Sequence, residues 1–389
     1  MSVEVVEVPL SQFNNLLSPN SSTGICAGKH SIAEYLVQNH HFLRLHLPSK
    51  ASALPSSISE DIARLRPTVT DEKGTRGLTF PDIDSLLDFV TKRWREHWVL
   101  TDIYDDATLE SLLRRPFFML MSVDAPVTLR FQRFSDRCKR RTISPPSLST
   151  FVTWSDTSLY CHAPQSHGTA YLSSRSHLHI LNNFLTLSSF YAALNTLDVI
   201  SSTRLRPSWD AYFMTLASLA AQRSNCMKRR VGCVLVSQNN RVISTGYNGT
   251  PRGIRNCNDG GCARCNAGPG TGAGLSTCLC LHAEENALLE AGRERIREGS
   301  VLYCDTCPCL TCSVKITQVG ISEVVFSQSY NMDTETAAIF REAGVKLRQF
   351  SPPRNGLINL GLDTRGEPGQ DGEAEVGENV MVIGNGVNP

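Results

Sequence analysis

The sequence lacks the features that mark a membrane protein, a secreted protein or a nucleic-acid-binding protein. Nowhere in its 389 residues does an apolar run approach the ~20 residues that a membrane-spanning helix needs. Residues 1–8 are too acidic, and their apolar run is too short, for a signal peptide. The net charge is only +1 and no stripe of basic and aromatic residues occurs, which argues against binding to long nucleic acids. We therefore expect a cytoplasmic protein with neither a membrane nor a nucleic acid as its partner.

One short basic run, residues 137–141, leaves localisation in the nucleus open as well. A solvated helix face is the simpler interpretation of such a run, and a nuclear-targeting patch is the alternative.

Cysteine is abundant, in contrast to these absences. The chain has 14 cysteines, and most of them lie between Cys226 and Cys312. In a chain without a secretory leader, clustered cysteines favour metal binding over disulfides.

The strongest single signal is His282-Ala283-Glu284 followed by Pro308-Cys309-Leu310-Thr311-Cys312. This H-x-E and P-C-x-x-C pair is the described pattern of the zinc-dependent nucleobase deaminases. A catalytic zinc site has three protein ligands and keeps the fourth position for water. His282, Cys309 and Cys312 supply those three ligands. Cys309 and Cys312 are three residues apart, so both thiolates can face one point from a single helical turn.

Glu284 is the candidate for proton transfer. Zinc lowers the pKa of bound water from about 15.7 to about 7. A carboxylate beside that water can take its proton, pass it to the ring nitrogen of the substrate and later protonate the leaving amine.

A structural zinc site with four closed ligands is the alternative. In that case Cys307 would be the fourth ligand or would replace Cys309. Otherwise we expect Cys304 and Cys307 to be ordinary buried thiols.

Strand and helix patterns alternate from residue 206 to residue 350, which predicts an α/β layered domain. The expected helices are residues 212–223, 282–291, 309–319 and 334–343. The expected strands are residues 231–236, 241–245, 301–304, 324–326 and 346–350. Residues 251–277 have no period and are expected to form a loop. Residues 351–389 are rich in Pro, Gly, Glu and Asn, so we expect a disordered tail.

The N-terminal half contains a degenerate phosphate-loop pattern. Residues 24–31 read G-I-C-A-G-K-H-S, whereas a nucleotide-binding loop reads G-x4-G-K-[ST]. A helix is expected at residues 31–38 and a buried strand at 117–123. We expect an irregular N-terminus over residues 1–23, with no strand before the loop.

We interpret residues 24–140 as a degenerate P-loop-kinase-like α/β domain with a structural role. Nucleotide binding without catalysis and active phosphotransfer are the alternatives. Residues 141–205 are expected to form a linker or insertion containing a helix.

Residues 206–350 resemble the deoxycytidylate (dCMP) deaminase family, in particular its fungal members. Besides the zinc motif, the resemblance is carried by residues 206–210, 221–232, 246–251 and 328–330. It implies a cytidine-deaminase-like three-layer domain, with a five-stranded mixed sheet flanked by helices, assembled as a homo-hexamer. It also implies hydrolysis of dCMP to dUMP for thymidylate synthesis, with dCTP, accompanied by Mg²⁺, as activator and dTTP as inhibitor. The implied effector site is the turn containing Gly246, Tyr247 and Gly249.

The same resemblance assigns substrate contacts. Asn248 would bind the deoxyribose, Ala283 and Glu284 the base edge, and Tyr330 the ring. Alternatively, Asn248 is a turn residue and Tyr330 a core aromatic residue. The substrate phosphate needs cationic or N–H donors. The candidates are Arg223, Ser224 and the basic residues at 228–230.

A second metal site is predicted in the glycine-rich loop. Cys262 and Cys265 form a C-x-x-C half-site. Cys257 and either Cys278 or Cys280 could complete four ligands, so a structural zinc would order a loop without an apolar core. Reduced thiols around a flexible effector loop are the alternative.

Two competing functions remain at this point. One is a deaminase acting on a free nucleoside or on nucleic acid. The other is a non-catalytic sensor of zinc and nucleotide, although a sensor has no need of the proton shuttle Glu284.

Overall fold

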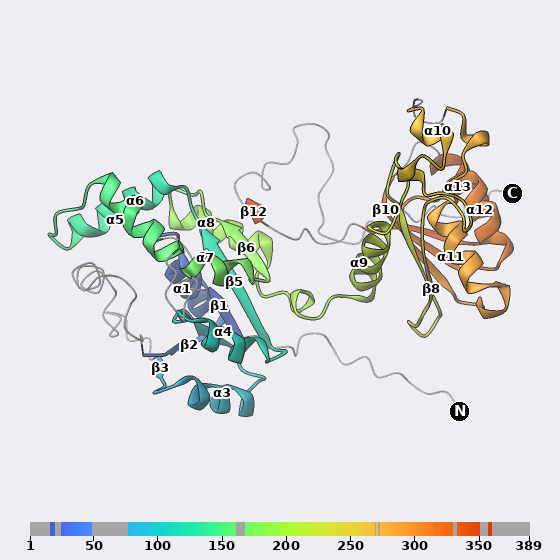
Figure 1. The fold of residues 1–389 in the computed structure, drawn as a ribbon. Helices are drawn as coiled ribbons and strands as arrows, with labels where there is room; N and C mark the ends of the chain where they lie inside the picture. The colour runs from blue at the N-terminus through green and yellow to red at the C-terminus, as the bar shows by residue number, and fades with distance from the viewer. Residues whose placement is uncertain are drawn as a thin grey trace, which may run out of the picture. The chain divides into compact units, whose positions relative to one another are not determined.

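The computed structural model describes residues 16–19, 25–48, 77–160, 168–268, 270, 273–329, 333–350 and 357–359. The chain divides into two compact units (Figure 1). Met1–Arg206 belongs to the first unit, Pro207–Pro353 belongs to the second, and residues 357–359 belong to the first again. Within the described residues, no helix has both the length and the apolarity that crossing a membrane requires.

A seven-stranded sheet forms the centre of the first unit, in the order β12-β6-β5-β1-β4-β2-β3, and every neighbouring pair is parallel. The strands are β1 (Leu16–Pro19), β2 (Leu43–His46), β3 (Leu78–Thr79), β4 (Trp98–Leu100), β5 (Phe118–Asp124), β6 (Leu178–Leu181) and β12 (Leu357–Asn359). The helices are α1 (Lys29–His40), α3 (Ile83–Lys92), α4 (Asp106–Leu113), α5 (Val127–Arg140), α6 (Leu148–Tyr160), α7 (Gly168–Ser174) and α8 (Leu187–Leu197). The predicted helix at 31–38 and the predicted strand at 117–123 are confirmed as α1 and β5.

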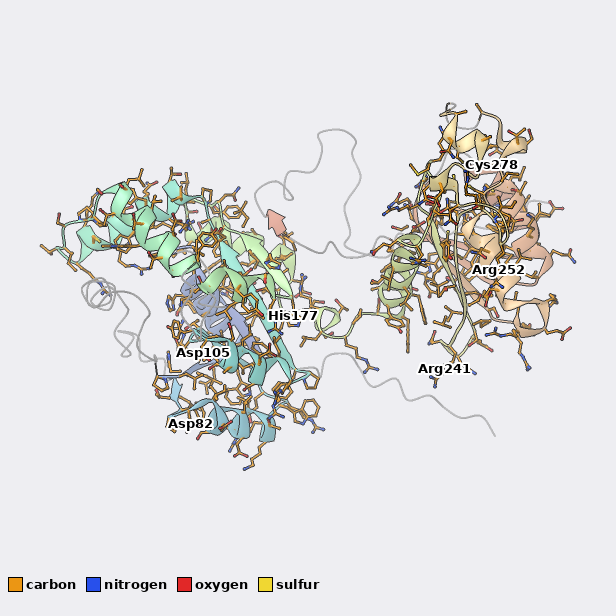
Figure 2. All side chains as sticks on the ribbon, in the orientation of Figure 1. Asp82, Asp105, His177, Arg241, Arg252 and Cys278 are labelled. Carbon is orange, nitrogen blue, oxygen red and sulfur yellow. The ribbon has the colours of Figure 1, made fainter. Side chains whose placement is uncertain are left out.

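Helices α3 and α4 begin at aspartates that cap them, and both aspartates are labelled in Figure 2. The side chain of Asp82 accepts a hydrogen bond from Ser85 N, and that of Asp105 accepts one from Thr108 N. Each cap satisfies an N–H group that has no partner within the helix, which fixes where the helix begins.

The prediction that no strand precedes the degenerate phosphate loop is wrong. Strand β1 lies in the middle of the sheet, between β4 and β5. The surrounding sequence is polar and turn-like, so local preference does not indicate a strand. Hydrogen bonding to two neighbouring strands overrides that preference, as is common for short central strands.

Residues 141–205 contain helix, as predicted, but they do not form a linker. This segment contributes α6, α7, β6 and α8 to the first unit. Phe151 of α6 is fully buried and packs with Phe134 of α5, and β6 pairs with β5. The sequence did not reveal that these elements belong to the first unit, because the residues that they pack and pair with lie in other parts of the chain.

Strand β12 contradicts the expected disorder at residues 357–359. It pairs with β6, and Ile358 is buried in the same apolar cluster as Ile180. The last strand of the first unit therefore follows the second unit in the sequence. The rest of the predicted tail lies outside the described residues.

We predict that Ile358→Asp destabilises the first unit by on the order of 2–4 kcal/mol, because it places a carboxylate in an apolar cluster without a partner. Calorimetry of the full chain should show an earlier unfolding transition. Ile358→Val serves as the matched control, and the zinc content of the second unit should not change. Equal transition temperatures for Ile358→Asp and the unmodified chain would contradict the packing of β12.

The second unit contains a five-stranded mixed sheet in the order β11-β10-β9-β7-β8. Strand β7 is antiparallel to both β8 and β9, and the other pairs are parallel. The strands are β7 (Gly232–Val236), β8 (Val242–Tyr247), β9 (Val301–Thr306), β10 (Glu323–Gln328) and β11 (Lys346–Gln349). The helices are α9 (Trp209–Ala221), α10 (Ala263–Asn266), α11 (Ala283–Ala291), α12 (Leu310–Gln318) and α13 (Asp333–Glu342). The predicted cytidine-deaminase-like architecture is confirmed here.

The second unit has three layers, because helices cover both faces of its sheet. Successive side chains of β7 point to opposite faces. Cys233 and Leu235 face a core formed with α11, α12 and α13. Val234 and Val236 face the opposite core, which is covered by α9. Successive strand residues point to opposite faces, so one buried strand serves both cores.

Gly246 allows β8 to approach α11 closely. A Cβ atom at this position would lie 2.0 Å from the carbonyl oxygen of Ala283. Any side chain here would push the strand away from the first turn of α11, which carries Glu284.

Asp210 connects α9 to the sheet through a half-buried polar network. Its carboxylate accepts hydrogen bonds from Tyr303 Oη at 2.8 Å and from Arg348 Nη1 at 2.6 Å. Arg348 Nε also donates to Glu323 Oε1 at 2.9 Å. Burial raises the pKa of Asp210, but the hydrogen bonds from Arg348 and Tyr303 outweigh burial, and the pKa is lowered.

We predict that Asp210→Asn lowers the free energy of unfolding of the second unit by about 1.5–3 kcal/mol at neutral pH. A carboxyl whose pKa is depressed on folding stabilises the fold above its unfolded pKa of about 3.9, and this stabilisation is lost as the pH falls through the folded pKa. The difference between the two proteins should therefore vanish in acid. Denaturant titrations at several pH values measure it, and Lys346→Gln, at a mostly exposed partner of Glu323, should have little effect. A difference that persists unchanged at low pH would contradict this assignment.

Candidate active site

The three predicted metal ligands lie together where α11 and α12 begin. His282 is the N-cap residue of α11, Cys309 is the N-cap residue of α12, and Cys312 lies in the first turn of α12. His282 Nδ1 lies 3.3 Å from Cys309 Sγ and 3.4 Å from Cys312 Sγ. Ligands at about 2.1 and 2.3 Å from a tetrahedral zinc are about 3.6 Å apart. The three residues therefore fit a zinc ion bound through Nδ1 of the histidine.

The surroundings of Cys309 favour the ionised form of its thiol. A hydrogen bond from Cys312, followed by one from His282, lowers the pKa of Cys309 to about 3. The hydrogen bond with Cys309 in turn raises the pKa of His282 to about 9. The N-terminus of α12 also favours negative charge.

Glu284 is a buried carboxyl next to this group, with 4% of its surface exposed. Burial raises its pKa to about 7. A general acid and base works best with a pKa near the working pH. Glu284 therefore has the ionisation that proton transfer at neutral pH requires.

The neighbouring Glu285 has a different role. Its side chain accepts a hydrogen bond from His282 N and pairs with Lys315. It caps α11 and fixes the helix that carries Glu284.

Cys304 and Cys307 are buried thiols, as expected. Among the described residues, the group of ligand atoms at this site consists of His282, Cys309 and Cys312. The alternative with Cys307 as a fourth ligand receives no support from this geometry.

Asn248 holds the turn between α9 and β7. Its Oδ1 accepts from Val231 N at 2.8 Å and from Ser224 Oγ at 2.6 Å, and its Nδ2 donates to Arg229 O at 2.7 Å. Asn248 therefore stabilises a turn, which was the alternative to a role in substrate binding. Its predicted contact with the deoxyribose stays a prediction.

The remaining predicted contacts fall in three groups. Arg223 is exposed at the end of α9, and Arg229 donates to Gln328 Oε1 at 2.8 Å. Tyr330 lies outside the described residues. In the predicted effector turn, Tyr247 O accepts from Asn286 Nδ2 at 2.9 Å, and Gly249 forms a backbone bridge with Leu281.

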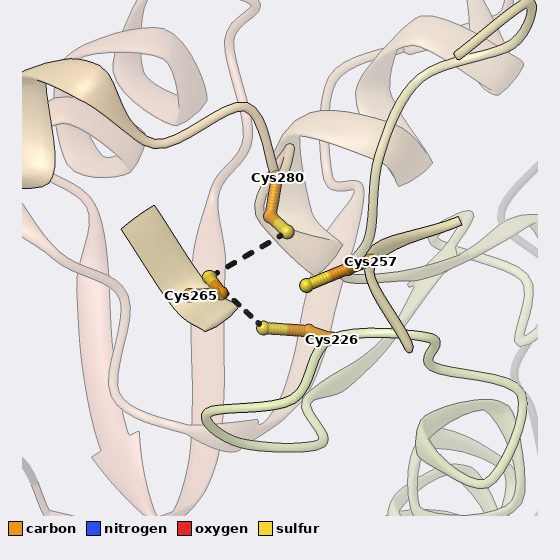
Figure 3. A group of neighbouring side chains, drawn as sticks. All are labelled: Cys226, Cys257, Cys265 and Cys280. Carbon is orange, nitrogen blue, oxygen red and sulfur yellow. Dashed lines mark hydrogen bonds between the residues drawn. The ribbon is translucent and has the colours of Figure 1, made fainter. Parts of the chain in front are cut away.

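Five loop cysteines and Cys226 form one cluster. Four of them, Cys257, Cys262, Cys265 and Cys280, are buried, and Cys226 and Cys278 are partly buried. In Figure 3, Cys226, Cys257, Cys265 and Cys280 point toward one another. The sequence predicted Cys257, Cys262, Cys265 and either Cys278 or Cys280, with Cys280 preferred, as ligands of one ion. In the structure Cys257 and Cys262 fall in different groups of four, and Cys226, which the sequence did not predict, joins the group of Cys257. Cys226 lies 31 residues before the nearest loop cysteine, Cys257, and has no half-site spacing of its own.

The comparisons with known proteins agree with the site. Residues 207–328 match the cytidine and deoxycytidylate deaminase zinc-binding region. The chain is 47% identical over 335 residues to deoxycytidylate deaminase of Schizosaccharomyces pombe. The matched region covers 86% of this chain and 97% of that protein. The chain belongs to the deoxycytidylate deaminase family.

Deoxycytidylate deaminase of Saccharomyces cerevisiae is 48% identical over 282 residues, covering 69% of this chain and 86% of that protein. Both matches extend well beyond the second unit, so these fungal family members share part of the first unit as well. Among solved structures, dCMP deaminase from the cyanophage S-TIM5 in complex with dCMP and dUMP is 30% identical and covers 37% of this chain and 98% of that chain, with a TM-score of 0.31.

Proposed function

We propose that this protein hydrolyses dCMP to dUMP and ammonia and so supplies dUMP for thymidylate synthesis. The observation that carries the proposal is the group His282, Cys309 and Cys312 beside the buried carboxyl of Glu284, in a chain of this family. A zinc ion held by the three ligands would supply hydroxide at neutral pH.

The protein's own contribution is proton transfer and positioning. Glu284 can accept a proton from water and donate it to N3 of the cytosine ring. It can then take the proton of the hydroxyl added at C4 and transfer it to the departing amine. Glu285 and Lys315 hold the first turn of α11, so the carboxyl of Glu284 stays in place.

The proposed substrate site uses the turn between α9 and β7 together with the motif residues. Asn248 would bind the deoxyribose, Ala283 and Glu284 the base edge, and Tyr330 the ring. Arg223 and Ser224, or the basic residues at 228–230, would bind the phosphate. Ser224 Oγ donates to Asn248 Oδ1 at 2.6 Å, so the proposed phosphate and sugar contacts come from adjacent side chains.

Regulation and assembly are proposed on the family resemblance. The turn containing Gly246, Tyr247 and Gly249 would bind dCTP, with Mg²⁺, as activator and dTTP as inhibitor. The turn contacts α11 through Tyr247 and pairs with Leu281 through Gly249. An effector bound there would thus act directly on the segment that presents His282. The assembly would be a homo-hexamer.

The first unit is proposed to be a degenerate P-loop-kinase-like domain with a structural role. The parallel order β2-β4-β1-β5-β6 and Lys29 at the start of α1 support this relation. Ala27, in the described part of the degenerate loop, is contacted by the protein itself. Arg133 Nη1 donates to Ala27 O at 3.2 Å, and Asn182 Nδ2 donates to the same oxygen at 2.8 Å. Lys29 Nζ donates to Thr101 O at 3.3 Å. These contacts favour the structural role over phosphotransfer.

The cysteine cluster is proposed to hold structural zinc. The sulfur atoms of Cys226, Cys257, Cys265 and Cys280 lie within 4.8 Å of one another, as four ligands of one ion require. The segment that they join consists of short turns and the single-turn helix α10, so a metal would supply the stability that its core lacks.

The test is turnover of dCMP, CMP, deoxycytidine and a short single-stranded DNA by the full chain, with and without dCTP and Mg²⁺. We expect dCMP to be preferred and its deamination to rise with dCTP. Turnover of deoxycytidine or DNA alone would keep the zinc chemistry and overturn the substrate. No turnover by zinc-loaded protein would favour the sensor.

A further inference from the structure

The six clustered cysteines fall into two overlapping groups of four. One group contains Cys226, Cys257, Cys265 and Cys280, and the other contains Cys262, Cys265, Cys278 and Cys280. Within each group, all sulfur atoms lie within 4.8 Å of one another. Cys265 and Cys280 belong to both groups.

We propose that this cluster binds two zinc ions that share two thiolates. Cys265 and Cys280 would bridge the ions, Cys226 and Cys257 would complete one tetrahedron, and the remaining two cysteines would complete the other. The inference rests on the proposal that the cluster holds zinc, and it changes the number of ions and the set of ligands.

The distances between sulfur atoms fit two tetrahedra with a common edge. Two thiolates on one tetrahedral zinc, each bonded at about 2.3 Å, lie about 3.8 Å apart. Cys265 Sγ lies 3.9 Å from Cys226 Sγ, 3.9 Å from Cys280 Sγ and 3.7 Å from Cys278 Sγ. A disulfide would require about 2.05 Å. Cys265 therefore has tetrahedral spacing toward both groups at once, which a bridging sulfur explains.

The second group has the same spacing between its terminal sulfurs. Cys262 Sγ and Cys278 Sγ lie 4.0 Å apart. One terminal sulfur of each group also accepts a backbone N–H: Met227 N donates to Cys257 at 3.5 Å and Leu279 N donates to Cys262 at 3.4 Å. N–H groups directed at sulfur stabilise thiolate ligands. Both halves are thus built in the same way.

A single zinc ion would leave two of the six cysteines without a metal. It would bind four sulfurs and leave two thiols packed against thiolates, and Cys262 is fully buried. A second ion uses those two thiols. Each bound thiol loses its proton to water, and no oxidation or reduction occurs. Two zinc ions with six thiolates carry the same net charge as one zinc ion with four.

As a bridging ligand, Cys280 would let the cluster position the backbone that carries His282. Cys280 is followed by Leu281, which pairs with Gly249, and then by His282. Fixing Cys280 on two ions therefore fixes the backbone that presents the catalytic-site histidine. The cluster itself does not touch the reacting atoms.

Native mass spectrometry of the full, zinc-loaded chain tests the inference without any substitution. We expect three zinc ions per chain, one at His282 and two in the cluster. Two ions would overturn the binuclear cluster while keeping a structural zinc. One ion would overturn structural zinc altogether.

Substitutions then assign the ions. Cys262→Ala should lose one zinc ion per chain and Cys265→Ala should lose two, while Cys26→Ser, at a cysteine of the first unit, should keep all three. Equal losses in Cys262→Ala and Cys265→Ala would contradict bridging. If Cys265→Ala does not fold, the unmodified chain loaded with ¹¹³Cd decides the question: two cluster resonances coupled through sulfur are expected, and uncoupled resonances would contradict the bridge.

Discussion

Glu284→Gln is expected to lower the rate of dCMP deamination by about 10²–10⁴-fold, the usual contribution of general acid–base catalysis, while the protein keeps its zinc. Glutamine has nearly the shape of glutamate and cannot accept or donate the transferred proton. Glu284 does not belong to the metal-ligand group, so we expect the variant to keep the ligands of the ion. Steady-state rates and metal analysis on the same preparation measure both effects.

Glu285→Gln is the matched control for this prediction. Glu285 lies next in the sequence, but its carboxylate caps α11 and pairs with Lys315. We expect this variant to keep most of its activity. Near-normal turnover in Glu284→Gln, or an equal loss in both variants, would show that Glu284 is not the proton-transfer residue.

Cys309→Ser is expected to lose both the zinc at His282 and nearly all turnover. Substitutions of residues that only support metal ligands already lower metal affinity by about 10–100-fold, so loss of a ligand should exceed this range. Cys309 Sγ lies 3.3 Å from His282 Nδ1, within the group of metal ligands. Zinc content by native mass spectrometry and dUMP formation report the two losses.

Cys307→Ala controls for the loss of a nearby thiol. Cys307 is buried two residues before Cys309 but does not belong to the ligand group. This variant should keep the zinc. Full zinc content in Cys309→Ser together with zinc loss in Cys307→Ala would reassign the ligand to Cys307.

Short-range motifs explain why the grouping of His282, Cys309 and Cys312 could be predicted from the sequence. His282 and Glu284 lie two residues apart, and Cys309 and Cys312 share one helical turn, so local geometry already brings each pair together. The alternation of strands and helices after residue 206 then predicted the layered domain that joins the two pairs. The comparisons confirm the family to which these motifs pointed.

Long-range pairing explains what the sequence could not predict. Strand β1 is stabilised by β4 and β5, and β12 reaches β6 from beyond the second unit, so neither has a strong local pattern. Cys226 joins the loop cysteines only through the tertiary fold. In each case the partner lies far away along the chain, and local propensity carries no information about it.

The central claim is that dCMP deamination depends on the zinc held by His282, Cys309 and Cys312. The most direct measurement is dUMP formation from dCMP by one preparation of the full chain before zinc removal by a chelator, after removal and after zinc is returned. The account predicts that turnover falls with the loss of zinc and recovers when zinc is restored. Undiminished deamination by protein that contains no zinc would contradict it.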